Sequence, residues 1–211
     1  MSVTAPKGFR AAGVAAGLKS NGRRDVALVV NDGPDATVAG VFTTNRVKAA
    51  PVRWTQQVVR GGVVRAVILN SGGANACTGP LGFQDTRATA EQVVSALSGA
   101  DARVRIGVGE VAVCSTGLIG ERLPMDKLLP GVRAAVRELS RTGGPAAAEA
   151  IMTTDTRPKT TVVEGTGWTV GGMAKGAGML APALATMLCV ITTDAVVGSA
   201  ALDAALREAC R

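Results

Sequence analysis

The stretch KGAGMLAPALATMLCVITTDA, residues 175 to 195, divides the chain into two parts of different character. It begins with a glycine-rich segment, passes through Pro182, and continues as an apolar run that opens with a single hydroxyl group, that of Thr186. The proline argues against one continuous helix, and residues 186–192 are strongly β-prone. Thr186 is therefore either an ordinary β-branched residue that opens a strand or a residue with a chemical role.

Outside this stretch, strand-like and helix-like segments alternate, which indicates one α/β or mixed α+β unit without a repeat or linker. We expect strands over residues 26–31, 37–44, 63–70, 106–115, 160–164, 168–173 and 186–192. We expect helices over residues 85–97 with Asp85 as the N-cap, 130–139 with Pro130 in the first turn, 146–152 and 199–210. Turns at residues 32–34 and 165–167 would join strands into hairpins.

Composition excludes several classes of function. At 211 residues the chain is long enough for a sizeable core, but it has only three Phe, two Trp and no Tyr, which argues against a base-stacking surface. The net charge of +7 would suit an acidic ligand or a solvated basic surface, and the scattered Lys and Arg do not predict nucleic-acid binding. The apolar run at 179–191 is too short to span a membrane, and we expect a cytoplasmic protein.

The chain has no histidine, so it cannot contain a Ser-His-Asp triad or a Cys-His dyad. No metal site is expected either, because the four cysteines lie far apart, and we interpret them as reduced thiols in core or strand positions. They are Cys77, Cys114, Cys189 and Cys210. A nucleophile would need a lysine, a carboxylate or its own α-amino group as the base. A cut before Thr186 would give this threonine a free α-amino group, which could act as the base for its own hydroxyl.

Four other short motifs have an ordinary and a chemical interpretation. Lys175 is a surface lysine or pairs with a substrate carboxylate, since the P-loop spacing for phosphate is not met. Residues 115–120, STGLIG, form a turn or present backbone N–H groups as an oxyanion hole. Residues 152–155, MTTD, read as a turn. Residues 70–79, NSGGANACTG, read as a loop that needs positive φ angles.

Taken together, four of these stretches give the chain a family resemblance. AVILNSGGANACTG, AVCSTGLIGERLPMDK, IMTTDTRPK and GGMAKGAGMLAPALATML occur in the order and rough spacing of the ornithine acetyltransferase family, the ArgJ-type glutamate N-acetyltransferases. The N-terminal TAPKGFRAAGVAAGLK is also similar to the start of that family. The resemblance implies an ArgJ/DmpA-like fold in which an N-terminal threonine, exposed by self-cleavage, is the nucleophile.

For this chain, the resemblance implies a cut between Ala185 and Thr186. Thr186 would then take the acetyl group from N-acetylornithine, release ornithine and pass the acetyl group to glutamate. Thr116 and Gly117 would form the oxyanion hole, and Thr153 and Lys175 would bind substrate. An α2β2 assembly would follow cleavage, with no bound cofactor and no metal; whether acetyl-CoA is also a donor stays open.

Family precursors are about twice this length, so the resemblance implies an α-chain-like domain over 1–185 and only the start of a β-chain-like region over 186–211. We expect the strand and helix after Thr186 to leave an apolar sheet edge with little cover. Two alternatives therefore stand beside an active acetyltransferase. One is a truncated, inactive family member, and the other is an N-terminal-nucleophile amidohydrolase or aminopeptidase that transfers the acyl group to water.

Overall fold

The computed structural model describes residues 2–101, 105–177 and 186–211. Its elements, in chain order, are β1 (Phe9–Val14), β2 (Val26–Asn31), α1 (Ala50–Arg60), β3 (Ala66–Gly73), α2 (Gly79–Ala100), the short 3-10 helix η1 (Val108–Glu110), β4 (Val111–Leu118), α3 (Met125–Arg137), α4 (Gly144–Ala150), β5 (Lys159–Gly165), β6 (Trp168–Lys175), β7 (Leu188–Thr193) and α5 (Ser199–Ala209).

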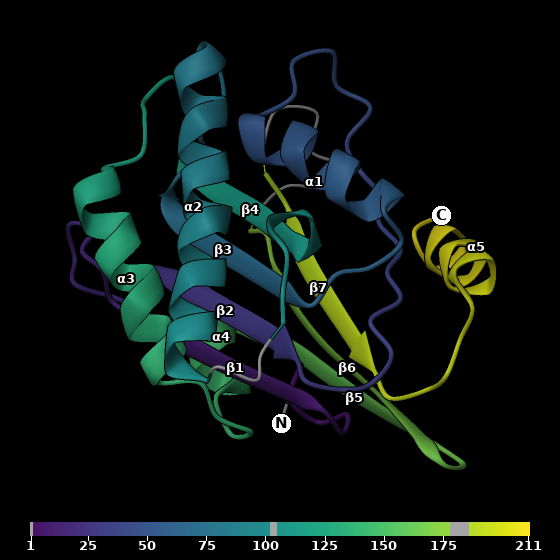
Figure 1. Ribbon diagram of the computed structural model, residues 1–211. Coiled ribbons are helices and arrows are strands. Elements are labelled where there is room, and N and C mark those ends of the chain that lie inside the picture. Colours follow the sequence, from purple (N-terminus) through teal and green to yellow (C-terminus); the bar gives the residue numbers. More distant parts are fainter. Residues whose placement is uncertain (1, 102–104, 178–185) are drawn as a thin grey trace.

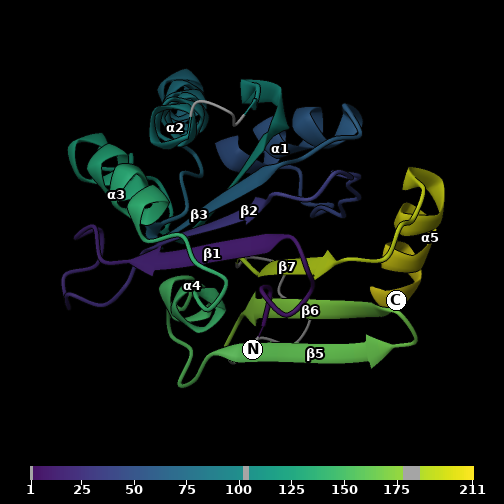
Figure 2. The same cartoon turned by 60° about the horizontal axis from the view of Figure 1, so that its bottom comes forward.

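These elements form stacked layers around a four-stranded sheet of order β1-β2-β3-β4 (Figures 1 and 2). Helices α2 and α3 pack on one face of this sheet, with α1 beside them. On the other face lie α4 and a second, three-stranded antiparallel sheet of order β5-β6-β7. The mixed α/β fold class expected from the sequence is confirmed.

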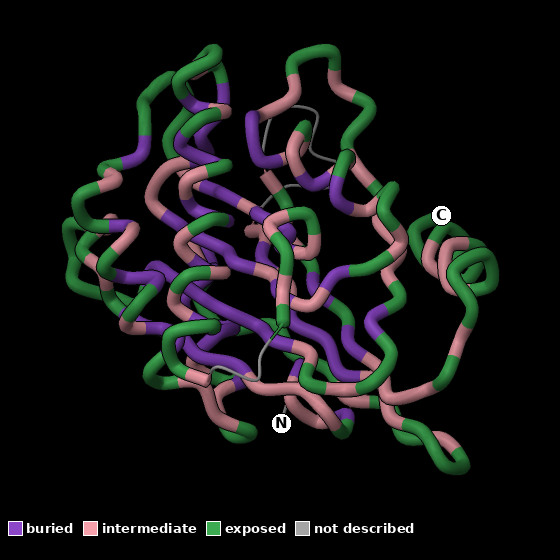
Figure 3. Tube along the Cα trace, viewed as in Figure 1, coloured by how far each residue is buried: buried purple, intermediate pink, exposed green. Residues whose placement is uncertain are grey.

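Strand β2 lies inside the first sheet and is buried on both faces (Figure 3). Alternate residues face opposite layers, so that Leu28 packs with the cluster under α2 and α3 and Val29 packs with the cluster toward α4. A strand that is buried on both faces needs a continuous apolar run, which explains the sequence VALVVN over residues 26–31.

Strands β3 and β4 run parallel, with α2 in the connection between them, so their carboxyl ends meet at one edge of the sheet. The outer edge of β4 is covered by α1. The Thr55 hydroxyl donates to the Val113 carbonyl oxygen at 2.7 Å and accepts from the Val113 N–H at 2.9 Å, and the Trp54 indole donates to the Val111 carbonyl oxygen. These bonds satisfy backbone groups that an edge strand would leave open.

In the second sheet, the hairpin expected around residues 165–167 is confirmed as β5 and β6, and β7 pairs with the other side of β6. Strand β7 forms an edge of this sheet, and Met187 and Ile191 are exposed there. No residue of α5 is buried, and the helix stands clear of the two sheets in Figures 2 and 3. The sparsely covered apolar edge expected after Thr186 is therefore present.

Three sequence-based expectations about this fold are wrong. Residues 37–44 form no strand apart from one bridge between Thr37 and Val63, because the first sheet already pairs β2 with β1 and β3. Asp85 is not an N-cap: α2 begins at Gly79, with a proline tolerated in its first turn, and Asp85 lies inside the helix. Helix α3 starts five residues before Pro130, and its buried face offsets the hydrogen bond that this proline removes.

Strand β1 and helix α1 were not expected from the sequence, and two cysteines lie outside the core and strand positions expected for them. Cys114 and Cys189 lie in β4 and β7, but Cys77 and Cys210 are exposed and lie outside the strands. All four are free thiols. Burial raises the pKa of the Cys114 thiol to about 12, so this group is unreactive at neutral pH.

Candidate active site

Thr186 and Thr116 lie against each other although 70 residues separate them in the sequence. Thr116 is in the last part of β4, in the first sheet, and is only 1% exposed. Thr186 lies two residues before β7, in the second sheet, and is half-buried. A hydrogen bond joins their two hydroxyl oxygens, and either oxygen can be the donor. The structure thus brings together the expected nucleophile and an expected oxyanion-hole residue.

Lys175 is the third member of this cluster. It is the last residue of β6, it pairs with Leu188 of β7, and only 5% of it is exposed. Its ammonium group donates to the Thr116 hydroxyl at 3.1 Å and to the Thr186 carbonyl oxygen at 3.2 Å. Burial lowers the pKa of Lys175, Asp155 opposes this shift, and Lys159 adds to it. The surface-lysine interpretation is therefore wrong.

Gly117 follows Thr116 and lies close to the backbone of β3 at Gly72 and Gly73. Its φ angle is 131°, and a Cβ atom there would lie 2.5 Å from the carbonyl carbon of Gly72 and 2.7 Å from the nitrogen of Gly73. The register between the two strands shifts at this point. Only glycine fits this backbone without displacing β3. The glycine of the STG motif, residues 115–117, is therefore required by its contact with the glycines of the SGG motif, residues 71–73.

The loop interpretation of residues 70–79 is confirmed for its second half. Three residues there adopt positive φ angles, namely Asn75 at 48°, Cys77 at 59° and Gly79 at 64°. The first half, however, belongs to β3, where Asn70 bridges strands by accepting from the Ser115 hydroxyl and donating to the Gly73 carbonyl oxygen. Sequence reasoning missed this pair, although polar residues at two adjacent strand ends could have indicated it.

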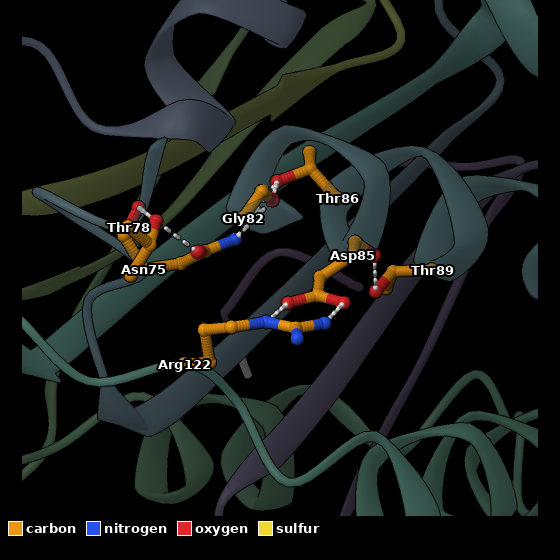
Figure 4. Close-up of polar contacts among 7 residues, drawn as sticks. All are labelled: Asn75, Thr78, Gly82, Asp85, Thr86, Thr89 and Arg122. Carbon is orange, nitrogen blue, oxygen red and sulfur yellow. Dashed lines mark hydrogen bonds and ion pairs between the residues drawn. The ribbon is translucent and has the colours of Figure 1, made fainter. Parts of the chain in front are cut away.

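A polar network holds the loop after β4 against α2 (Figure 4). Arg122 binds the buried Asp85 carboxylate through two hydrogen bonds, of 2.9 and 2.6 Å. Nearby, the Asn75 amide donates to the Gly82 carbonyl oxygen at 2.8 Å and to the Thr86 hydroxyl at 3.0 Å. The network therefore fixes both segments that leave the parallel strand ends.

Thr153 does not join the cluster directly. Its N–H donates to the Asp155 carboxylate at 3.2 Å, and within the described ranges no hydrogen bond connects it to Thr116, Lys175 or Thr186. The connection runs through Asp155, which also accepts from the Gly176 N–H at 2.8 Å. The turn expected at residues 152–155 is confirmed, and Asp155 is a residue of the site that sequence reasoning did not single out.

A further buried carboxylate, that of Asp25, supports the site from the N-terminal side. Asp25 is fully buried and accepts backbone N–H groups from Ala16, Leu18 and Lys19 at 2.6, 2.6 and 3.0 Å. The loop that it fixes packs against β3, since a Cβ atom at Gly72 would lie 2.8 Å from the Leu18 carbonyl oxygen. Sequence reasoning missed this residue as well.

The described residues show neither a metal-binding cluster nor a membrane-spanning helix, and an open cavity among them lies apart from the expected site residues. Ala185, the expected residue before the cut, lies outside the described residues. Within the three described ranges, no group of three or more metal-binding side chains comes together. Across those same ranges, no helix has the length and apolar character needed to cross a membrane. An open cavity on the outer side of α1 is lined by Arg46, Lys48 and neighbouring residues, and none of the expected site residues contributes to it.

Comparison with known proteins identifies the family. The family model for ArgJ matches residues 10–211, which is nearly the whole chain. This chain belongs to the ArgJ family. It is 67% identical over 210 residues to the arginine biosynthesis bifunctional protein ArgJ of Mycolicibacterium paratuberculosis, covering 98% of this chain and 52% of that protein. The ArgJ protein of Mycobacterium tuberculosis gives the same identity and coverage.

Among solved structures, the chain is similar to ornithine acetyltransferase from Mycobacterium tuberculosis, crystallised in complex with ornithine. The TM-score is 0.83 at 64% sequence identity, and the match covers 89% of this chain and 96% of the other. The chain thus shares an ArgJ fold, and it spans about half the length of the curated relatives it matches.

Proposed function

We propose that this ArgJ chain belongs to an acyltransferase that moves the acetyl group of N-acetylornithine to glutamate through an acetyl ester on Thr186. The observation that carries the proposal is the meeting of Thr116 from the first sheet with Lys175 of the second sheet and Thr186 in the segment that enters the second sheet. The names of the relatives support the reaction class, since they are arginine biosynthesis proteins and the similar crystal structure holds ornithine.

The proposed reaction needs no histidine. The α-amino group that a cut would free on Thr186 takes the proton from its own hydroxyl, and the oxygen attacks the acetyl carbonyl carbon. The C–N bond of N-acetylornithine breaks, and ornithine leaves with that proton. The amine of glutamate then attacks the ester, its proton returns to the Thr186 oxygen, and N-acetylglutamate is released. This order of steps predicts ping-pong kinetics.

The surrounding groups suit the charge that develops in this reaction. The N–H of Gly117 and the hydroxyl of Thr116 would donate to the oxyanion of each tetrahedral intermediate. Lys175 would attract the α-carboxylate that ornithine and glutamate substrates share. Thr153, held beside the cluster through Asp155, would complete the substrate contacts.

We propose that Thr186 becomes N-terminal through self-cleavage after Ala185, which would divide the family protein into a 1–185 unit and a unit beginning at 186. The two comparisons with Mycobacterium tuberculosis support this division. The present chain covers 52% of the curated ArgJ protein but 96% of the crystallised chain, so the crystallised chain is about half as long as the curated protein. An α2β2 assembly in the cytoplasm is the arrangement that we propose for the cut subunits.

The word bifunctional in the names of the relatives supports a second acetyl donor. We propose acetyl-CoA for this role, as a co-substrate that acylates Thr186 and leaves as the free thiol. No bound cofactor is needed in either half-reaction, because the acetyl group is carried by Thr186 alone.

The decisive experiment is intact-protein mass spectrometry of the purified chain beside a Thr186→Ala control. We expect two species, one that ends at Ala185 and one that starts at Thr186, and neither in the control. Incubation with N-acetylornithine then separates the alternatives: N-acetylglutamate indicates transfer, and acetate indicates an amidohydrolase. An uncut, inactive chain that becomes active only with the remaining half of a family protein would mean that this chain is a partial, inactive unit.

A further inference from the structure

Asp155 is a buried carboxylate at the junction of three chain segments. None of its side chain is exposed, and it accepts hydrogen bonds from donors in each segment. These donors are the Thr153 N–H in the turn after α4 at 3.2 Å, the Lys159 ammonium at the start of β5 at 2.5 Å, and the Gly176 N–H just after β6 at 2.8 Å. A buried carboxylate with several donors is a strong organising contact.

This contact joins Thr153 and Lys175, between which the described part of the chain shows no direct hydrogen bond. Gly176 follows Lys175 directly, so the bond to its N–H fixes the backbone at the point where the Lys175 side chain departs. The bond to the Thr153 N–H fixes the substrate-side turn on the same carboxylate. The distance between these two expected substrate contacts is therefore set by Asp155.

Asp155 also supplies the attractive charge for Lys175. The charged groups that act on this part of the site are Lys19 from the loop after β1, Lys159 from β5 and Asp155 itself. Both lysines repel the Lys175 ammonium, and the carboxylate attracts it. Asp155 shares its charge with Lys159 through a direct ion pair, so the state of Lys159 changes how strongly Asp155 acts on Lys175.

We propose that Asp155 is a positioning residue of this active site, which holds Lys175 and the Thr153 turn in one arrangement and acts as the counter-ion of Lys175. The part of Lys175 in substrate binding rests on the proposed function, but the linkage between the three segments does not. Asp155 acts through other groups, and among the described residues its hydrogen bonds do not reach Thr116 or Thr186.

The test compares Asp155→Asn with the matched variant Lys159→Gln, both in a Thr186→Ala chain that stays in one piece. NMR titration of isotope-labelled lysine side chains reports the pKa of each amine, and the six lysines of the chain make assignment simple. We expect Asp155→Asn to lower the pKa of Lys175, because the attraction is lost. We expect Lys159→Gln to raise it, because a repulsive charge is lost and the carboxylate is no longer shared.

Opposite shifts in the pKa of Lys175 distinguish this proposal from a merely structural role. Both variants break the same ion pair, so a loosened structure alone would shift this pKa in the same direction in both. Amide hydrogen exchange at Gly176 and Thr153 should accelerate in Asp155→Asn and stay slow in Lys159→Gln. Shifts of the same sign, or unchanged exchange at both amides in Asp155→Asn, would overturn the proposal.

If Asp155→Asn does not fold, Lys159→Gln still decides the charge linkage, because the Lys159 side chain is 46% exposed and tolerates substitution. In that variant, a fall or no change in the pKa of Lys175 would overturn the proposal. The titration does not depend on cleavage or turnover. A failure of the proposed acetyltransferase reaction would therefore be seen separately, in the mass spectrum and the acetyl-transfer assay of the unmodified chain.

Discussion

Replacing Gly117 with alanine should be among the most damaging small substitutions in this chain. The added Cβ atom would lie 2.5 Å from the carbonyl carbon of Gly72 and 2.7 Å from the nitrogen of Gly73. Both are backbone atoms of β3, so no side-chain rotation can relieve the contact. The φ angle of 131° adds strain, because residues with a Cβ atom rarely adopt it.

The expected loss is the sum of two terms. A positive φ angle costs a non-glycine residue about 1–2 kcal/mol. Overpacking against fixed atoms costs about 1–3 kcal/mol. Together they give about 2–5 kcal/mol, out of about 5–15 kcal/mol for the free energy of unfolding of a typical domain. Urea denaturation followed by circular dichroism measures this difference, provided that the slope with denaturant is unchanged.

Gly120→Ala is the matched control for this measurement. Gly120 has a φ angle of 92°, but no atom lies within 4 Å of the position of its added Cβ. We expect this variant to lose only the backbone term, about 1–2 kcal/mol. If Gly117→Ala costs no more than Gly120→Ala, the close approach of β3 and β4 is wrong, and so is the argument that glycine is required beside the proposed oxyanion hole.

Three further changes test other contacts. Burial raises the pKa of Asp155 but its three hydrogen bonds lower it more, to about 2 from an ordinary 3.8. This shift should stabilise the folded chain by about 2 kcal/mol above pH 4, and the stabilisation should be lost as the pH falls through 2. Urea denaturation at a series of pH values measures this loss, which should be absent in Asp155→Asn. Thr55→Val should lower the free energy of unfolding by about 2–4 kcal/mol, because it leaves the N–H and the carbonyl group of Val113 unpaired, whereas Thr55→Ser should leave it unchanged. Urea denaturation measures both variants. Asp85→Asn should lower the free energy of unfolding by about 2 kcal/mol, because it weakens the ion pair of the buried Asp85 with Arg122. Glu91→Gln, in the exposed pair with Arg87, should change it by less than about 0.5 kcal/mol, and thermal denaturation measures both variants.

Patterns that act within a few residues of one another were sufficient to predict some of the local elements. The apolar run of β2 and the glycine turn between β5 and β6 predict their own structure, because burial on two faces and a tight turn both have short-range sequence signals. The positive φ angles at Asn75 and Cys77 were likewise foreseen from the composition of that loop.

The errors occurred where distant residues decide the outcome. Residues 37–44 have the composition of a strand, but β2, with which they would form the expected hairpin, already has a neighbour on each side. Asp85 has the chemistry of an N-cap, yet its partner is Arg122, 37 residues away. The contact of Asp155 with Gly176 was missed for the same reason, since these two residues are 21 positions apart in the sequence.

The cluster of Thr116, Lys175 and Thr186 shows why motifs alone could single out candidate residues but not place them. Thr116 belongs to the first sheet, whereas Lys175 and Thr186 belong to the second sheet and the segment that enters it. Their separation therefore depends on how the two sheets pack, through buried residues such as Met173 and Leu69. No single motif contains that information. It follows that a substitution in this apolar layer, far from any hydroxyl or amine, can misalign the site while every functional side chain remains present.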